Sequence, residues 1–102
     1  MIIWSDNLYF SKDIKDSKKV KIKKSIEKGK LNFEIYCITF ASNNQNLFDI
    51  MNVNELLFPY YVRKDMYIVG IATSKEEAIL LVVDMLMEVY NNTGDFLVRE
   101  YF

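Results

Sequence analysis

The sequence predicts an α+β fold, a two-layer sandwich in the ferredoxin-like order βαββαβ with both long helices on one face of an antiparallel sheet. Residues 66–72 form an apolar run rich in β-branched residues, and a helical pattern follows it to Asn92. Residues 31–41 carry apolar or small side chains on both faces, which is typical of an interior strand. A lysine-rich helical pattern precedes that strand, so helices and strands alternate along the chain.

The N-terminal part of this prediction rests on the weakest signals. Residues 8–10, with the sequence Leu-Tyr-Phe, are predicted as a short first strand. They could instead form an ordered arm, and the alternative fold is then a three-stranded α/β sheet with an N-terminal arm. Within residues 11–30, two isoleucines four apart predict a helix with a thin apolar stripe, with Ser17 as its N-cap and Gly29 at its C-terminal end.

The middle of the chain predicts a partly helical connection. Residues 42–46 are a polar break with side chains that cap helices, and the apolar spacing of residues 47–51 then predicts a short helix. A second helical turn is expected at residues 54–58. It should end at Pro59, because proline lacks the backbone N–H that continuation of a helix needs.

The predicted strand at residues 66–72 leads into the best-specified helix of the chain. Gly70 within the strand indicates a bulge or a close approach of another part of the backbone. Ser74 is the expected N-cap, and Glu77, three residues later, completes a capping box. Since these side chains occupy the start of the helix, we expect no anion site there.

The helix that follows has more apolar surface than one core needs. Its acidic residues Glu77, Asp84 and Glu88 recur at intervals of seven and four, which places them on one narrow stripe. The rest of its circumference is apolar, so it must be covered on more than one side. Gly94 is expected to end the helix, and the alternation in residues 95–102 predicts a last strand.

Length and composition limit the class of protein. With 102 residues, the chain is expected to be one α+β domain, residues 1–102. It has one cysteine, Cys37, no signal-peptide pattern and no apolar stretch of the ~20 residues that span a membrane, so we expect a cytoplasmic protein. The absence of histidine excludes Ser-His-Asp and imidazole zinc sites; it disfavours an enzyme without excluding carboxylate, lysine or tyrosine chemistry. We expect no cofactor, no metal site and no catalytic residue.

The net charge of −1 conceals a strong segregation of charge. Residues 12–30 contain nine lysines and three acidic residues, a balance of +6, whereas residues 31–102 contain four basic and ten acidic residues, a balance of −6. Asp6 supplies the remaining −1. The basic segment could bind nucleic acid or another anion, through Lys18, Lys19, Lys21, Lys23 and Lys24. The alternative is a solvated helix face whose lysines balance the acidic remainder.

The connector at residues 60–64 is the other candidate site. Aromatic and cationic side chains follow one another there, namely Tyr60, Tyr61, Arg63 and Lys64. Such a combination can stack bases and hold phosphates, or hold a small anionic ligand beside the sheet. The alternative is that both tyrosines cover the core and the cations are solvated.

Several short motifs run through the chain. They are LLFPYY at residues 56–61, RK at 63–64, YIVGIA at 67–72, EEA at 76–78, LV at 81–82, EVY at 88–90, TGD at 93–95 and YF at 101–102. In these motifs, and in the basic stretch after Leu8 and Tyr9, most of the chain resembles a family of small bacterial proteins of the Firmicutes type to which no function is attached. The resemblance implies one compact domain in a bacterial cell and implies no activity.

From these observations we expect a small non-enzymatic interaction protein that forms homo-oligomers. The apolar surplus of the helix at residues 78–90, or a sheet edge, would supply the contact. The alternatives are nucleic-acid or anion binding by the basic segment at residues 12–30, and a small-ligand site at the connector.

Overall fold

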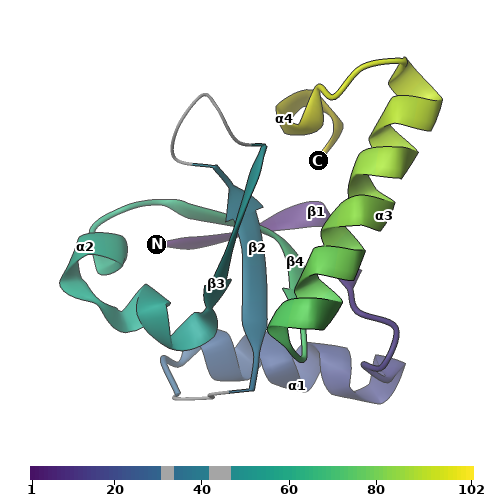
Figure 1. Cartoon of the computed structure of the whole chain (residues 1–102). Helices are drawn as coiled ribbons and strands as arrows, with labels where there is room; N and C mark the ends of the chain where they lie inside the picture. Colours follow the sequence, from purple (N-terminus) through teal and green to yellow (C-terminus); the bar gives the residue numbers. More distant parts are fainter. Residues whose placement is uncertain (31–33, 42–46) are drawn as a thin grey trace.

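The structure is a computed structural model that describes residues 1–30, 34–41 and 47–102 (Figure 1). The elements follow in the order β1 (Ile2–Phe10), α1 (Asp16–Glu27), β2 (Tyr36–Phe40), β3 (Phe48–Asn52), the 3-10 helix η1 (Val53–Leu57), α2 (Pro59–Val62), β4 (Met66–Ala72), α3 (Lys75–Thr93) and α4 (Val98–Tyr101). The predicted α+β class is therefore confirmed.

Within the described residues, four strands form one mixed sheet in the order β1-β4-β2-β3. β4 runs parallel to β1 and antiparallel to β2, and β2 runs antiparallel to β3. This is not the predicted ferredoxin-like arrangement, because one pair of neighbouring strands is parallel and the chain ends in a helix. The alternative with an N-terminal arm is also wrong, since β1 pairs with β4 near both of its own ends, at residues 2–4 and 9–10.

The two long helices cover opposite faces of the sheet. Successive side chains of a strand point to opposite faces, so β2 and β4 each contribute to two cores. The first core lies on the side of α1 and contains Ile26 of that helix with Cys37, Ile68 and Ile71. The second core lies on the side of α3 and contains Ile38, Val69, Ala72, Ala78, Leu81 and Met85. Figure 1 shows α1 across the lower end of the sheet and α3 along its side.

The unit formed by β4 and α3 agrees with the prediction in almost every feature. Ile38 lies opposite Gly70 while the next residue of β2 lies opposite Ile68, which leaves one extra residue of β4 as a bulge. Ser74 begins the helix, and its Oγ accepts a hydrogen bond from the backbone N–H of Glu77 at 3.1 Å. Gly94 ends the helix with a φ of 74°, the left-handed conformation that favours glycine.

The limits of α1 and the course of the connector differ from the prediction. α1 has Lys15 at its N-cap position, not Ser17, whereas Gly29 follows the helix with a φ of 70° as expected. The predicted turn at residues 54–58 is the 3-10 helix η1. That turn ends before Pro59, as predicted, and Pro59 also begins α2, where its fixed φ suits the first helical position.

Two predicted elements have the wrong secondary structure. Residues 47–51, predicted as a helix, lie mostly in β3, because five residues of this strand pair with five of β2. Residues 95–102, predicted as a strand, contain α4, in which Val98 is buried and Phe102, four residues later, packs against the second core. The first part of the predicted strand, residues 31–33, and the predicted polar break at residues 42–46 lie outside the described residues.

Candidate functional site

A candidate interaction surface lies on the side of α3 that faces away from the sheet. Five large apolar side chains each leave between 48% and 58% of their surface exposed there. We call this surface the outer α3 face, and it consists of Ile79, Leu80, Val83, Met87 and Tyr90. The predicted apolar surplus of this helix is therefore an exposed surface in the single chain.

Helical geometry explains why α3 has two apolar faces. Residues 79, 83, 87 and 90 are separated by four, four and three positions, so they form one row along the helix. The buried residues of α3 occupy the opposite side and pack on the sheet, namely Ala78, Leu81, Met85 and Val89. A helix of a small domain normally has one apolar stripe, whereas α3 has a second one that its own sheet does not cover.

The outer α3 face continues past the end of the helix. The ring of Tyr90 stacks on the ring of Phe96, with centroids 5.2 Å apart and planes at 27°. Phe96 is itself 43% exposed. Gly94 makes this contact feasible, because its left-handed backbone turns the chain back toward the helix.

The three acidic residues predicted to form a stripe on α3 have different surroundings. Asp84 is exposed and Glu77 half-buried, whereas Glu88 faces neighbouring elements. The carboxylate of Glu88 accepts hydrogen bonds from the hydroxyls of Tyr9 and Tyr101. Burial, and then the bond to Glu88, raise the pKa of Tyr9 to about 12. Glu88 therefore fastens β1 and α4 to α3 and contributes to the fold.

The five candidate lysines of α1 do not form one site. Lys18, Lys21 and Lys24 are exposed, but Lys19 and Lys23 turn toward β1. The ammonium groups of these two lie 5.0 Å and 5.2 Å from the ring centroids of Phe10 and Trp4, respectively. Two of the five lysines thus cover aromatic rings of the sheet.

At the connector, the structure brings together three of the four predicted residues. Lys64 Nζ donates a hydrogen bond of 2.6 Å to the hydroxyl of Tyr60 and lies 4.0 Å from the centroid of its ring. The rings of Tyr60 and Tyr61 meet edge to face at 5.1 Å. Arg63 is exposed and lines neither of the two cavities described next.

A cavity of about 300 Å³ lies beside the connector, at the end of β2. Tyr60, Tyr61 and Lys64 line it, together with Thr39 and Arg99, which are not among the residues predicted from the sequence. The hydroxyl of Thr39 is buried without a hydrogen-bond partner among the described residues. Arg99 Nη2 donates to the carbonyl oxygen of Ala41 at 2.6 Å, which fixes α4 over the end of β2.

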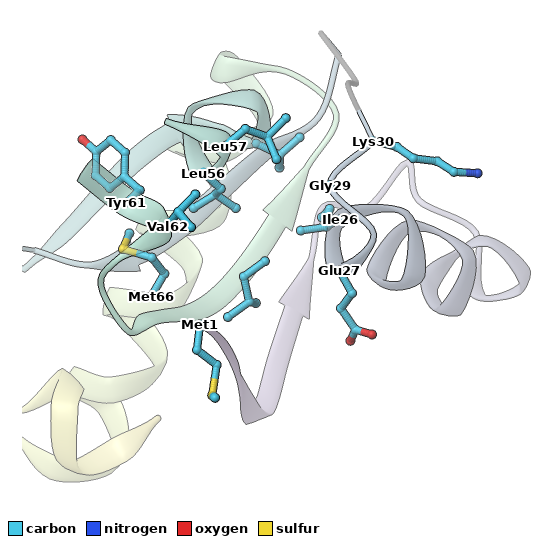
Figure 2. A pocket seen from close by; sticks show the side chains of 12 residues that line it. Met1, Ile26, Glu27, Gly29, Lys30, Leu56, Leu57, Tyr61, Val62 and Met66 are labelled. Atoms are coloured by element: carbon cyan, nitrogen blue, oxygen red, sulfur yellow. The ribbon is translucent and has the colours of Figure 1, made fainter. Parts of the chain in front are cut away.

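Figure 2 shows the side chains that line a second cavity, which has a volume of about 230 Å³. Its walls come from the starts of β1 and β4, the end of α1 and the η1–α2 segment, and most are apolar, including Ile26, Leu56, Val62 and Met66. Tyr61 lines both cavities and is also partly buried against the first core. A ligand at the connector stays a prediction.

No sequence signal could have found Thr39 or Arg99. Thr39 joins the cavity only because β2 pairs with both β3 and β4, and Arg99 only because α4 folds back over β2. The outer α3 face, in contrast, follows from local spacing alone.

Neither a metal-binding cluster nor a membrane-spanning helix is found in residues 1–30, 34–41 and 47–102. Within these ranges, no cluster of three or more cysteine or acidic side chains is arranged to hold a metal ion. Among the helices that the structure describes, none has the length and apolar character needed to cross a membrane. The fold and its surface thus define a small α+β protein with a helix-borne apolar face.

Comparison with protein-family models, with curated proteins and with solved structures finds no match to this chain.

Proposed function

We propose that this chain is a non-enzymatic interaction protein that self-associates as a symmetric dimer through the outer α3 face. The exposure of Ile79, Leu80, Val83, Met87 and Tyr90 on one side of one helix is the observation that supports the proposal. With Phe96, this patch is on the order of 500 Å², within the range of the largest apolar patch on a typical soluble protein, and such patches are often functional.

A second copy of the chain fits the outer α3 face best when the two helices run antiparallel. A two-fold axis at Val83 would pair Ile79 of each copy with Met87 of the other, so apolar side chains meet at the centre of the row. Glu76 lies on the same side of α3, seven residues before Val83, and is exposed. Antiparallel pairing carries Glu76 to the hydroxyl of the other copy's Tyr90, whereas parallel pairing would bring two Glu76 carboxylates together.

The size of the patch is close to what a dimer requires. A standard interface covers about 800 Å² of each partner. The apolar row supplies the central part of that area, and α3, which at 19 residues is ~28 Å long, supplies polar flanking positions. An apolar centre with a polar border is the usual composition of such interfaces.

Sedimentation velocity across a concentration series tests the proposal, with Val83→Glu as the disrupting variant. Two carboxylates would then face each other at the axis, and we expect dimerisation to weaken on the order of 100-fold. Val20→Glu is the matched control, because Val20 is an exposed valine on α1, far from the outer α3 face. A wild-type chain that stays monomeric at high micromolar concentration would overturn the proposal, as would equal effects of both substitutions.

A double variant tests the antiparallel direction. Ile79→Glu combined with Met87→Lys places opposite charges against each other in an antiparallel pair but like charges against each other in a parallel one. We expect the double variant to dimerise more tightly than either single variant. If it dimerises less tightly than both, the helices do not pair in the antiparallel direction.

A further inference from the structure

We propose that the exposed side of α1 binds the phosphate backbone of nucleic acid without reading its sequence. Four lysines at intervals of three, three and four residues are exposed there. Such intervals keep side chains on one side of a helix. We call this surface the outer α1 face, and it consists of Lys18, Lys21, Lys24 and Lys28.

The acidic residues of α1 do not oppose this charge. The carboxylate of Asp16 pairs with Lys19 Nζ at 2.8 Å, on the side of the helix near β1. Glu27 Oε1 accepts a hydrogen bond of 2.7 Å from the indole N–H of Trp4, a residue of β1. The acidic residues of α3 belong to the element that covers the opposite face of the sheet. The outer α1 face is therefore a continuous positive strip.

A shallow hollow lies in this strip between two of its lysines. It has a volume of about 180 Å³ and is lined by Lys18, Lys21, Ile22 and Ser25. Two of these residues carry ammonium groups and one a hydroxyl, and such groups can donate hydrogen bonds to phosphate oxygens. The hollow gives the strip a place for one phosphate, and Lys24 and Lys28 extend the contact along the helix.

The chemistry of the strip favours nucleic acid over an anionic membrane. A helix that lies in a membrane interface inserts several large apolar side chains, but α1 exposes only Val20 among its large apolar residues. The strip extends ~15 Å from Lys18 to Lys28, which suits a regular row of phosphates. Lysine acts as a point charge and seldom reads bases in the bidentate manner of arginine, so binding should be independent of sequence.

Fluorescence anisotropy with a short, mixed-sequence DNA duplex tests this proposal as a function of salt. For four phosphate contacts, we expect the binding constant to fall about 100-fold between ~50 and ~200 mM salt. In Lys18→Gln/Lys21→Gln, we expect the slope of log K against log salt to decrease in magnitude by about 2. Glutamine preserves helix propensity, so circular dichroism should show an unchanged fold.

The matched control removes two exposed cations outside the strip, Arg63 and Lys75, as Arg63→Gln/Lys75→Gln. Its net charge equals that of the lysine variant, and we expect it to bind as the wild type does. If both variants lost the same affinity for the duplex, binding would depend only on net charge, and the proposal would be overturned. Absence of binding at low salt would also overturn it, as would binding to vesicles of anionic lipid but not to the duplex. Val83→Glu should bind the duplex with the affinity of the wild type. A failure of DNA binding is therefore distinct from a failure of the proposed dimer.

Discussion

At the scale of single residues, Gly70 shows how tightly β4 is held within the sheet. A Cβ atom at this position would lie 3.0 Å from Ile38 Cδ1 and 3.3 Å from Leu81 Cδ2. The first atom belongs to the neighbouring strand and the second to α3, so the absence of a side chain lets three elements meet. Glycine is needed here for space, since its backbone has no positive φ.

We expect Gly70→Ala to lower the free energy of unfolding by about 1–3 kcal/mol, because the added methyl overpacks the second core. Urea denaturation measures this loss. Ile38→Val removes the atom in closest contact, so in a double-mutant cycle it should recover part of the loss caused by Gly70→Ala. Strictly additive effects would show that the contact with Ile38 does not cause the strain.

At the scale of elements, helix starts can be assigned only when the side-chain cap is identified correctly. Ser17 and Ser74 both precede helical patterns in the sequence, but only Ser74 caps a helix. Ser17 lies inside the first turn of α1, where its hydroxyl has no such role. The reciprocal capping box predicted for Ser74 occurs instead in η1, between Asn52 and Glu55.

We expect Ser74→Ala to lower the free energy of unfolding by about 1 kcal/mol, because the N–H of Glu77 loses its acceptor. Ser17→Ala serves as the control, and it should have little effect or a slight stabilising one, since alanine is the better helix former. Thermal and chemical denaturation of the two variants measure the difference. Equal losses in both variants would contradict this assignment of the caps.

The same scale explains which elements could be predicted from the sequence. β4 and α3 are specified by local signals, namely an apolar run, a cap and a terminal glycine. The apolar spacing in residues 47–51 fits a helix or a strand equally, and pairing with β2 decides for the strand. In residues 95–102, the spacing of Val98 and Phe102 is compatible with one helical turn and with an alternating strand. The helical turn forms because Phe102 packs against the second core. Non-local contacts therefore decide the ambiguous segments.

At the scale of the whole molecule, the sheet separates the two proposed surfaces. α1 packs on the first core and α3 on the second, so the outer α1 face and the outer α3 face point away from each other. A dimer formed through α3 would stack six layers, from the α1 of one copy to the α1 of the other. With layers about 10 Å apart, the two positive strips would lie roughly 50 Å apart on opposite sides of the dimer.

This arrangement predicts that the dimer bridges two nucleic acid molecules and gains little avidity on one. A short rigid duplex cannot reach both strips, because they face in opposite directions. With one duplex immobilised, the wild-type protein should capture a second, labelled duplex from solution. Val83→Glu should bind the immobilised duplex with unchanged affinity but capture little of the second one, since only the dimer has two strips. Equal capture by Val83→Glu would show that bridging does not require α3 pairing, and a lower affinity for one duplex would show that the strips act together on it.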